Sequence, residues 1–101
     1  MTTPSRLLGV DYGTVRVGLA ISDPDRKFAF PLSTYQRRSE KGDASHFRSV
    51  VAEEMVAALV VGLPLHLNGR EGEKAREARA FAAWLAEVTG LPAVLWDERF
   101  T

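Results

Sequence analysis

The segment 8–14, Leu-Gly-Val-Asp-Tyr-Gly-Thr, constrains the fold of this chain more than any other. Its apolar residues predict a buried strand that ends at Asp11, and Gly13 predicts a tight turn before a second apolar run that opens at Val17. A buried carboxylate is costly unless a partner compensates its charge. We therefore expect Asp11 to meet a partner at the end of this strand, and a metal ion, or a phosphate held through one, is the strongest candidate.

Three short segments near the start of the chain predict strands joined by tight turns. Residues 7–12 are rich in Leu and Val, and residues 16–22 alternate apolar with small or polar side chains, which is typical of a strand with one covered face. Asp-Pro-Asp at 23–25 predicts a turn, because proline presets φ and aspartate hydrogen-bonds its own backbone. Residues 28–35 predict a third strand, which Pro31 weakens or bends. We expect an antiparallel meander.

The spacing of apolar residues then changes from two to three or four. Asp43 is expected to cap a helix that carries an apolar face over residues 47–58. The wholly apolar residues 59–61 predict a short strand in a central, parallel position. A second helix, with its apolar face over residues 75–88, stops at Gly-Leu-Pro, and residues 93–96 form the last strand.

The element order β-β-β-α-β-α-β predicts one α/β domain over residues 1–101, a mixed sheet with helices packed on its faces. Acids end two of its strands: Asp11, and the pair Asp97 and Glu98. If the first strand is central and parallel to the later ones, these acids share the edge at which ligands of open α/β sheets bind. A hard divalent cation, Mg²⁺ or Mn²⁺, would relieve their repulsion, and a pair of such ions can serve phosphodiester hydrolysis.

Side-chain alternation favours one of the two neighbouring acids as the ligand. Successive strand residues face opposite ways, so we expect Glu98 to face Asp11 as the metal ligand and Asp97 to give close support. A purely structural role fits the spacing equally well. In that case Asp11 would cap a turn, and the other acids would pair with Arg99 or Arg16.

Composition excludes several kinds of protein. Thirteen basic and thirteen acidic residues give no formal net charge, so the basic balance typical of a nucleic-acid binder is absent overall. Residues 26–48 nevertheless carry six bases and two acids, a local excess of +4 that fits either a solvated face or a nucleic-acid footprint. The chain has no cysteine, no apolar signal core and no membrane-spanning run, and we expect a soluble, cytoplasmic protein without a membrane partner.

Several further features carry weaker functional signals. The loop 65–72 leads into a helix N-terminus, whose free N–H groups attract phosphate oxygens, although its glycines can equally serve the turn alone. Both histidines, His46 and His66, are expected at the surface. We expect packing in the core or at its rim, rather than stacking on bases, for four aromatic residues: Tyr12, Tyr35, Trp84 and Trp96.

Three motifs together span nearly the whole chain. The first is Leu-Gly-Val-Asp-Tyr-Gly-Thr at 8–14, followed by Arg16, Gly18, Ala20, Ser22 and Asp23. The second is Val-Val-Gly-Leu-Pro-Leu at 60–65, followed by Asn68, Gly69, Glu71 and Gly72. The third is Leu-Trp-Asp-Glu-Arg at 95–99, followed by Thr101. In this order and spacing the motifs resemble those of the YqgF/RuvX family of the ribonuclease H-like superfamily.

The resemblance implies a ribonuclease H-like fold and a bacterial, cytoplasmic, metal-dependent nuclease related to RuvC-type junction resolvases. Such a nuclease would mature the 5′ end of pre-16S rRNA in ribosome biogenesis or, alternatively, resolve Holliday junctions in DNA recombination and repair. Asp11 maps onto the first catalytic acid of the family, and Glu98, with Asp97 adjacent, maps onto the acid of the third motif. The candidates for substrate binding are Thr14, Arg16, Asn68, Arg70 and Arg99.

The end of the chain departs from the family pattern. Family members continue into a C-terminal helix with another catalytic aspartate, whereas the sequence here ends at Thr101, so either this is a truncated form or that acid is missing. We therefore expect low or no activity from these residues alone, and an uncovered sheet face that could drive homodimer formation.

Two other functions stay open at this point. One is a non-catalytic nucleic-acid-binding module, because the last catalytic acid is absent. The other is a sugar-kinase or actin-like ATPase, because Asp-x-Gly-Thr also opens that fold, although one domain of this length does not enclose ATP between two lobes. The sequence does not choose between RNA and DNA, since backbone contacts carry no sequence information and shape does the selecting.

Overall fold

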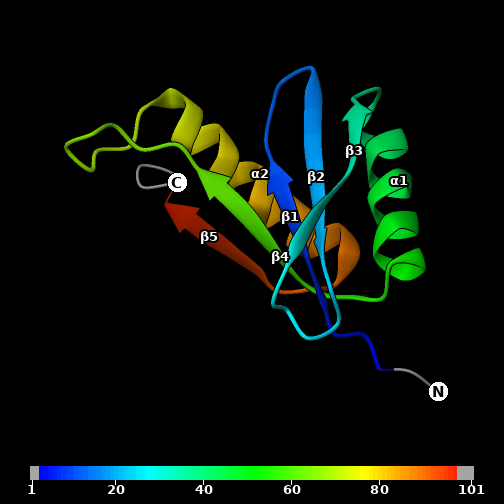
Figure 1. Cartoon of the computed structure of the whole chain (residues 1–101). Coiled ribbons are helices and arrows are strands. Elements are labelled where there is room, and N and C mark those ends of the chain that lie inside the picture. Colours follow the sequence, from blue (N-terminus) through cyan, green and yellow to red (C-terminus); the bar gives the residue numbers. More distant parts are fainter. Residues whose placement is uncertain (1–2, 98–101) are drawn as a thin grey trace.

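The computed structural model describes residues 3–97, which contain five strands and two helices in the predicted order (Figure 1). The first three strands are β1 (Arg6–Asp11), β2 (Arg16–Ser22) and β3 (Ala29–Gln36). They are followed by α1 (Glu40–Glu53), β4 (Val56–Leu63), α2 (Glu73–Thr89) and β5 (Ala93–Asp97). The α/β class is therefore confirmed. Neither of the described helices combines the length and hydrophobicity needed to cross a membrane.

The strands form a mixed sheet in the spatial order β3-β2-β1-β4-β5. β1 pairs antiparallel with β2, and β2 pairs antiparallel with β3, which confirms the predicted meander. β1 is parallel to β4, and β4 is parallel to β5. The carboxyl ends of β1, β4 and β5 therefore share one edge of the sheet, and Asp11 ends the central strand.

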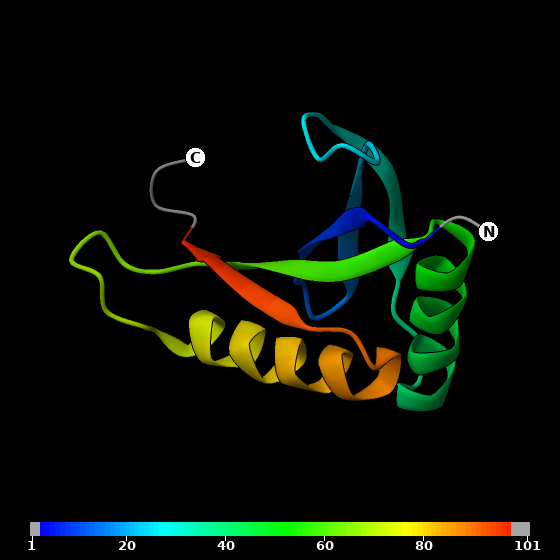
Figure 2. The same cartoon turned by 90° about the horizontal axis from the view of Figure 1, so that it is seen from below.

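Both helices pack on the same face of the sheet. In Figure 2, α2 runs along β4 and β5, and α1 stands beside the C-terminal end of α2. The crossovers β3–α1–β4 and β4–α2–β5 both advance across the sheet in the same direction. Because such crossovers are right-handed, both helices come to lie on one side. The opposite face, called the open face below, carries no helix among residues 3–97.

The core lies between the helices and the covered face. The buried side chains alternate along β1, β2 and β4 and meet aromatic residues of both helices. The most completely buried of the large apolar side chains are Leu8, Val17, Phe47, Leu59, Val61 and Leu85, and Phe81 packs with them. Tyr35 is buried with them, and Tyr12 and Trp84 pack at the rim, as predicted. Trp96 is different, because 57% of it is exposed on the open face, and the packing prediction for it is wrong.

The first helix begins and ends earlier than the sequence pattern indicated. Ser39 is the N-cap, and its Oγ accepts a hydrogen bond from the Gly42 N–H at 3.1 Å. Asp43 does not cap the helix but lies buried inside its first turn. The helix ends at Glu53, and Met55 has a positive φ of 55° that redirects the chain into β4. The expected helical face over residues 47–58 is thus wrong from Met55 onward, because Met55 lies in the turn after the helix and residues 56–58 belong to a strand.

The turn predicted at residues 23–25 and the irregularity predicted at Pro31 are both present. Asp23 Oδ1 accepts hydrogen bonds from the N–H groups of Lys27 (2.7 Å) and Phe28 (2.9 Å), which fixes the turn between β2 and β3. The pairing of β2 with β3 shifts register where Pro31 enters the strand. Proline donates no ladder hydrogen bond, so it is tolerated here, at the edge of the sheet.

The two histidines differ in environment. His66 is exposed in the loop before α2, as predicted. His46 is only partly exposed, and its ring stacks on Tyr35 with a centroid distance of 3.9 Å and an interplanar angle of 10°. Its buried Nε2 has no hydrogen-bond partner among residues 3–97, and burial lowers the pKa of this imidazole. The surface prediction for His46 is therefore wrong.

Candidate active site at the carboxyl edge of the sheet

Asp11 ends β1 on the open face of the sheet. Leu8 and Val10 point into the core, so alternation along the strand places Asp11 on the opposite side. The carboxylate is exposed, and within residues 3–97 it makes no hydrogen bond or ion pair. The strand is buried as predicted, but its terminal carboxylate is not, so desolvation does not by itself demand a partner for Asp11.

Strand register aligns Asp11 with two residues of the neighbouring strands. Val10 pairs with Val61, and Val61 pairs with Leu95, so the next row contains Asp11, Gly62 and Trp96. Gly62 places no side chain between the other two, which lie two strand spacings apart, about 9–10 Å. A hollow of about 500 Å³ on the open face is lined by this row. Gly18, which pairs with Asp11, also lines it, so the carboxylate faces an open space.

Asp97 ends β5 on the other face. It pairs with Leu63, one row beyond Asp11, and its alternate neighbours Ala93 and Leu95 pack against the core. Asp11 and Asp97 therefore occupy the same edge but opposite faces of the sheet. Glu98 and Arg99, the other candidates from the third motif, lie outside the described residues.

The turn after Asp11 has a backbone that only glycine fits. A Cβ placed on Gly13 would collide with the carbonyl oxygen of Arg16. The Val15 carbonyl accepts a hydrogen bond from the Arg37 N–H at 2.8 Å, which ties this turn to the end of β3. Two candidate substrate-binding residues are exposed close to this turn: Thr14 lies in the turn itself, and Arg16 is the first residue of β2.

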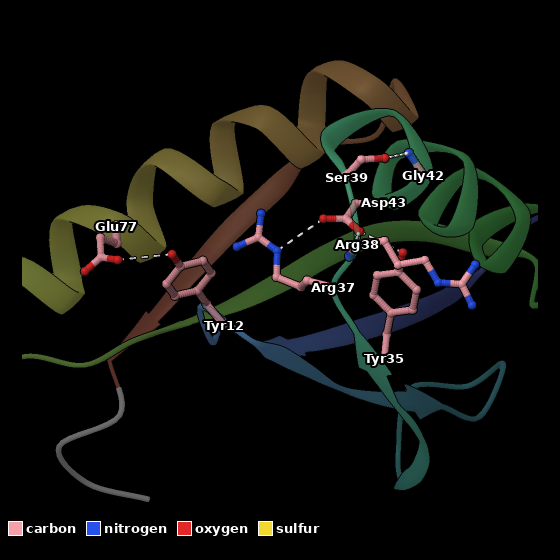
Figure 3. Close-up of polar contacts among 8 residues, drawn as sticks. All are labelled: Tyr12, Tyr35, Arg37, Arg38, Ser39, Gly42, Asp43 and Glu77. Carbon is pink, nitrogen blue, oxygen red and sulfur yellow. Dashed lines mark hydrogen bonds and ion pairs between the residues drawn. The ribbon is translucent and has the colours of Figure 1, made fainter.

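Tyr12 follows Asp11 and lies on the helix side of the edge (Figure 3). Its hydroxyl donates a hydrogen bond to Glu77 Oε1 at 3.2 Å, and its ring centroid lies 5.0 Å from that of Phe81. Burial and the hydrogen bond to the Glu77 carboxylate raise the pKa of Tyr12 above its usual value. The residue next to the candidate catalytic acid is thereby anchored to α2.

A buried carboxylate near this edge was assigned the wrong role from the sequence. Asp43, only 2% exposed, accepts hydrogen bonds from the Tyr35 hydroxyl (2.7 Å), Arg37 Nε (3.2 Å) and the Arg38 N–H (2.9 Å) (Figure 3). Burial opposes ionisation of Asp43, but these three hydrogen bonds outweigh it and lower the pKa of the carboxyl. Burial and the bond to Asp43 raise the pKa of Tyr35. The sequence did contain a signal for this role: Asp43 lies four residues after Ser39, which can cap the helix itself and leaves Asp43 inside the first turn.

The loop before α2 is a small closed hairpin. Leu65 forms a β-bridge with Glu71, the His66 N–H donates to the Arg70 carbonyl (2.9 Å), and Gly69 has a φ of 85°. Asn68 Oδ1 accepts from the Arg70 N–H at 2.9 Å, so this oxygen serves the turn itself. Asn68 and Arg70 are both exposed, in the loop that follows β4 at the shared edge.

The chemistry of the described residues fits a divalent cation only in part. Asp11 offers an exposed carboxylate, the ligand type that Mg²⁺ and Mn²⁺ prefer. Within residues 3–97, however, no three His, Cys, Asp or Glu side chains come together as a metal-binding group. Position 98, the expected second ligand, falls outside this range. The described part of the chain thus supplies one suitable ligand.

A five-stranded mixed sheet with its exposed acid at the end of the central strand defines a ribonuclease H-like fold. The arrangement is similar to that of Thermus thermophilus RuvC in a complex with a Holliday junction substrate, with a TM-score of 0.59 at 17% identity. That match covers 92% of this chain and 64% of RuvC. Archaeoglobus fulgidus Pelota shares the fold at a TM-score of 0.52 and 12% identity, over 95% of this chain and 27% of Pelota.

The family follows from the sequence comparisons. The model of the RuvX family, described as Holliday junction resolvase, matches residues 5–101, and the chain belongs to this family. A protein of Rhodopirellula baltica named "Putative pre-16S rRNA nuclease" is 53% identical over 95% of this chain. A protein of the same name from Bradyrhizobium sp. is 46% identical over 94% of it. The matches cover 56% and 59% of those two relatives, so the chain spans little more than half their length.

Proposed function

We propose that this chain carries the first catalytic acid of a metal-dependent nuclease that hydrolyses phosphodiester bonds at the 5′ end of pre-16S rRNA. One observation carries the proposal: Asp11 stands exposed at the end of the central strand, with a carboxylate that no residue in 3–97 engages. The family match and the names of the relatives support the reaction and the substrate. They favour a nuclease over the ATPase that Asp-x-Gly-Thr also allowed.

Each candidate residue has a role in this proposal. Asp11 and Glu98 would hold Mg²⁺ or Mn²⁺, with Asp97 as support. When bound, the ion supplies the Lewis acidity that activates water and stabilises the leaving oxygen. Thr14, in the turn after Asp11, and Arg16, at the start of β2, would hold the substrate backbone on one side of Asp11. Asn68 and Arg70 would hold it from the hairpin after β4, and Arg99 from the third motif.

Hydrolysis of a Holliday junction is the second candidate function. The description of the family model favours it, as does the likeness of the fold to RuvC. Both functions need the same carboxylates and differ in the shape of the nucleic acid that is cleaved. An assay must therefore vary the substrate to distinguish them, because a variant of Asp11 would affect both. A module that binds nucleic acid without cleaving it is the third candidate.

A cleavage assay with a matched control tests the proposal. We would compare the chain with Asp11→Asn, and with Asp25→Asn as a control in the exposed β2–β3 turn. Labelled pre-16S rRNA and a four-way DNA junction are incubated with Mn²⁺, and Mn²⁺ binding is measured separately by electron paramagnetic resonance. Asp11→Asn should weaken Mn²⁺ binding and abolish any cleavage that the chain shows, whereas Asp25→Asn should change neither.

The outcomes separate the three functions. Cleavage of the rRNA supports the proposal, and cleavage of the junction alone supports the second function. Nucleic-acid binding without Mn²⁺ binding or cleavage supports the binding module. Equal cleavage by the wild-type chain and Asp11→Asn would contradict the assignment of Asp11 as a catalytic acid.

A further inference from the structure

A second hollow lies on the helix side of the same edge, and of its lining residues the proposed function uses only Thr14. It measures about 730 Å³, within the range of about 300–1,000 Å³ that small-ligand sites occupy. Tyr12 and Thr14 form one wall, and α2 and the start of α1 form the others. Asp11 lines the first hollow and the next residue, Tyr12, lines the second, so the two hollows lie on opposite faces of the sheet at the same edge.

One stripe of α2 lines the hollow. Glu77, Ala80, Phe81 and Trp84 lie three and four residues apart, so they share one side of the helix. The rings of Phe81 and Trp84 stack at 5.5 Å with an angle of 29°, and Tyr12 lies against Phe81. Phe81 is only 6% exposed, so Tyr12 and Trp84 are the partly exposed rings of the hollow, and Ala80 is exposed and small.

Arg37 completes the wall as a flat, fixed cation. Its Nε is held by the buried Asp43, and its guanidinium carbon lies 5.1 Å from the Phe81 ring centre and 5.8 Å from that of Tyr12 (Figure 3). A guanidinium fixed at one edge loses little freedom when a planar group stacks on it. In Figure 3 the Arg38 side chain points away from Tyr12, so Arg37 is the cation that faces the aromatic residues.

The charges of the hollow indicate what it selects. Arg37 is already paired with Asp43, and the other charged residues that line the hollow are one base, Arg38, and two acids, Glu40 and Glu77. The hollow therefore carries no excess of positive charge to attract a phosphate. Aromatic rings and a guanidinium plane bind flat π-systems, and carboxylate oxygens accept hydrogen bonds from ring N–H and amino groups. A nucleobase has both features.

We propose that this hollow receives an unpaired nucleobase of the strand whose backbone lies at Asp11. The inference rests on the proposed nuclease function and adds a subsite to it. A base in a duplex is stacked and paired, so the hollow selects a strand with at least one unpaired nucleotide beside the scissile phosphate.

Two matched substitutions on α2 test the subsite. Ala80→Glu places bulk and charge in the hollow, whereas Ala83→Glu adds the same side chain at an exposed position that does not line it. Both keep a good helix former. Binding of labelled single-stranded RNA and DNA octamers, and of an RNA duplex, is measured by fluorescence anisotropy in EDTA. We expect Ala80→Glu to weaken single-strand binding about tenfold and Ala83→Glu to change it less than about twofold.

A second measurement reads the hollow directly. In a Trp96→Phe background, Trp84 is the remaining tryptophan, and a base that stacks beside it should quench its fluorescence. Quenching by single strands but not by the duplex supports the proposal, and the RNA and DNA arms report which sugar is preferred. Ala80→Gln separates the effect of bulk from that of charge.

The two proposals fail in different ways. If the wild-type chain binds neither RNA nor DNA, the nuclease proposal fails and the subsite falls with it. If the wild-type chain binds single strands, but Ala80→Glu binds as Ala83→Glu does and Trp84 is not quenched, the subsite alone is overturned.

Discussion

Asp11 and Tyr12 are neighbours in sequence with opposite surroundings. Side chains alternate across a strand, so Asp11 faces the open face and Tyr12 faces the helices. Tyr12 is held by Glu77 and Phe81, which fixes the backbone that carries Asp11. The exposed acid is thus positioned by its neighbour without any contact to its own carboxylate among residues 3–97.

Asp43 should make stability depend on pH in the acid range. Its folded pKa is lowered, so its contribution is fully present above the unfolded value of about 3.9 and is lost as pH falls through the folded value. Asp43→Asn should therefore flatten the acid limb of the stability curve. It should also cost about 2–3 kcal/mol at pH 7, because it removes the charge that Arg37 and Tyr35 bond.

Urea unfolding of both chains between pH 2 and pH 7 measures this effect. Asp25→Asn, in the exposed turn, serves as the control and should retain the wild-type curve. An Asp43→Asn variant whose stability falls with acid as steeply as the wild type would contradict the role given to Asp43.

At the scale of elements, Ser39 and not Asp43 caps the N-terminus of α1. Ser39 satisfies the Gly42 N–H, and its own carbonyl accepts from the Asp43 N–H at 2.8 Å. Ser39→Ala should destabilise the protein by about 1 kcal/mol, the usual cost of a lost cap. Ser49→Ala, at an exposed position inside the same helix, should be neutral or slightly stabilising.

Thermal and urea unfolding of the two serine variants distinguish these positions. Equal stabilities for Ser39→Ala and Ser49→Ala would mean that the cap contributes nothing. The comparison is informative because both substitutions remove the same atom from the same helix.

Elements could be predicted from the sequence where the apolar residues followed either the spacing of a strand or that of a helix. The prediction failed where the same residues fitted both spacings. The central strand, its terminal Asp11 and the parallel edge followed from the apolar runs. The end of α1 did not, because residues 56–58 fit a helical spacing as well as a strand, and only the positive φ of Met55 separates the two. Asp43 was misplaced because a buried acid with three donors looks like a cap in a sequence. Neither the anchor of Tyr12 on α2 nor the stack of His46 on Tyr35 has a local sequence signal.

At the scale of the whole molecule, the fold is a layer of helices on one face of a sheet. The right-handed crossovers fix this arrangement, and the open face keeps a carboxylate beside exposed apolar groups. Trp96 is 57% exposed and Val94 is 56% exposed there. Contiguous exposed apolar surface marks interaction sites. One face thus carries both the candidate chemistry and the surface most prone to association.

The open face should drive weak self-association of this chain. We expect concentration-dependent dimers in analytical ultracentrifugation, and Trp96→Ser should weaken them about tenfold or more, because a buried aromatic residue at an interface contributes about 2 kcal/mol. Val15→Ser, an equally exposed apolar residue in the β1–β2 turn, should leave them unchanged.

A second copy on the open face would cover the hollow beside Asp11, so an oligonucleotide that binds there should shift the chain toward monomer. A chain that stays monomeric at every concentration, or dimers that persist in Trp96→Ser, would contradict this prediction.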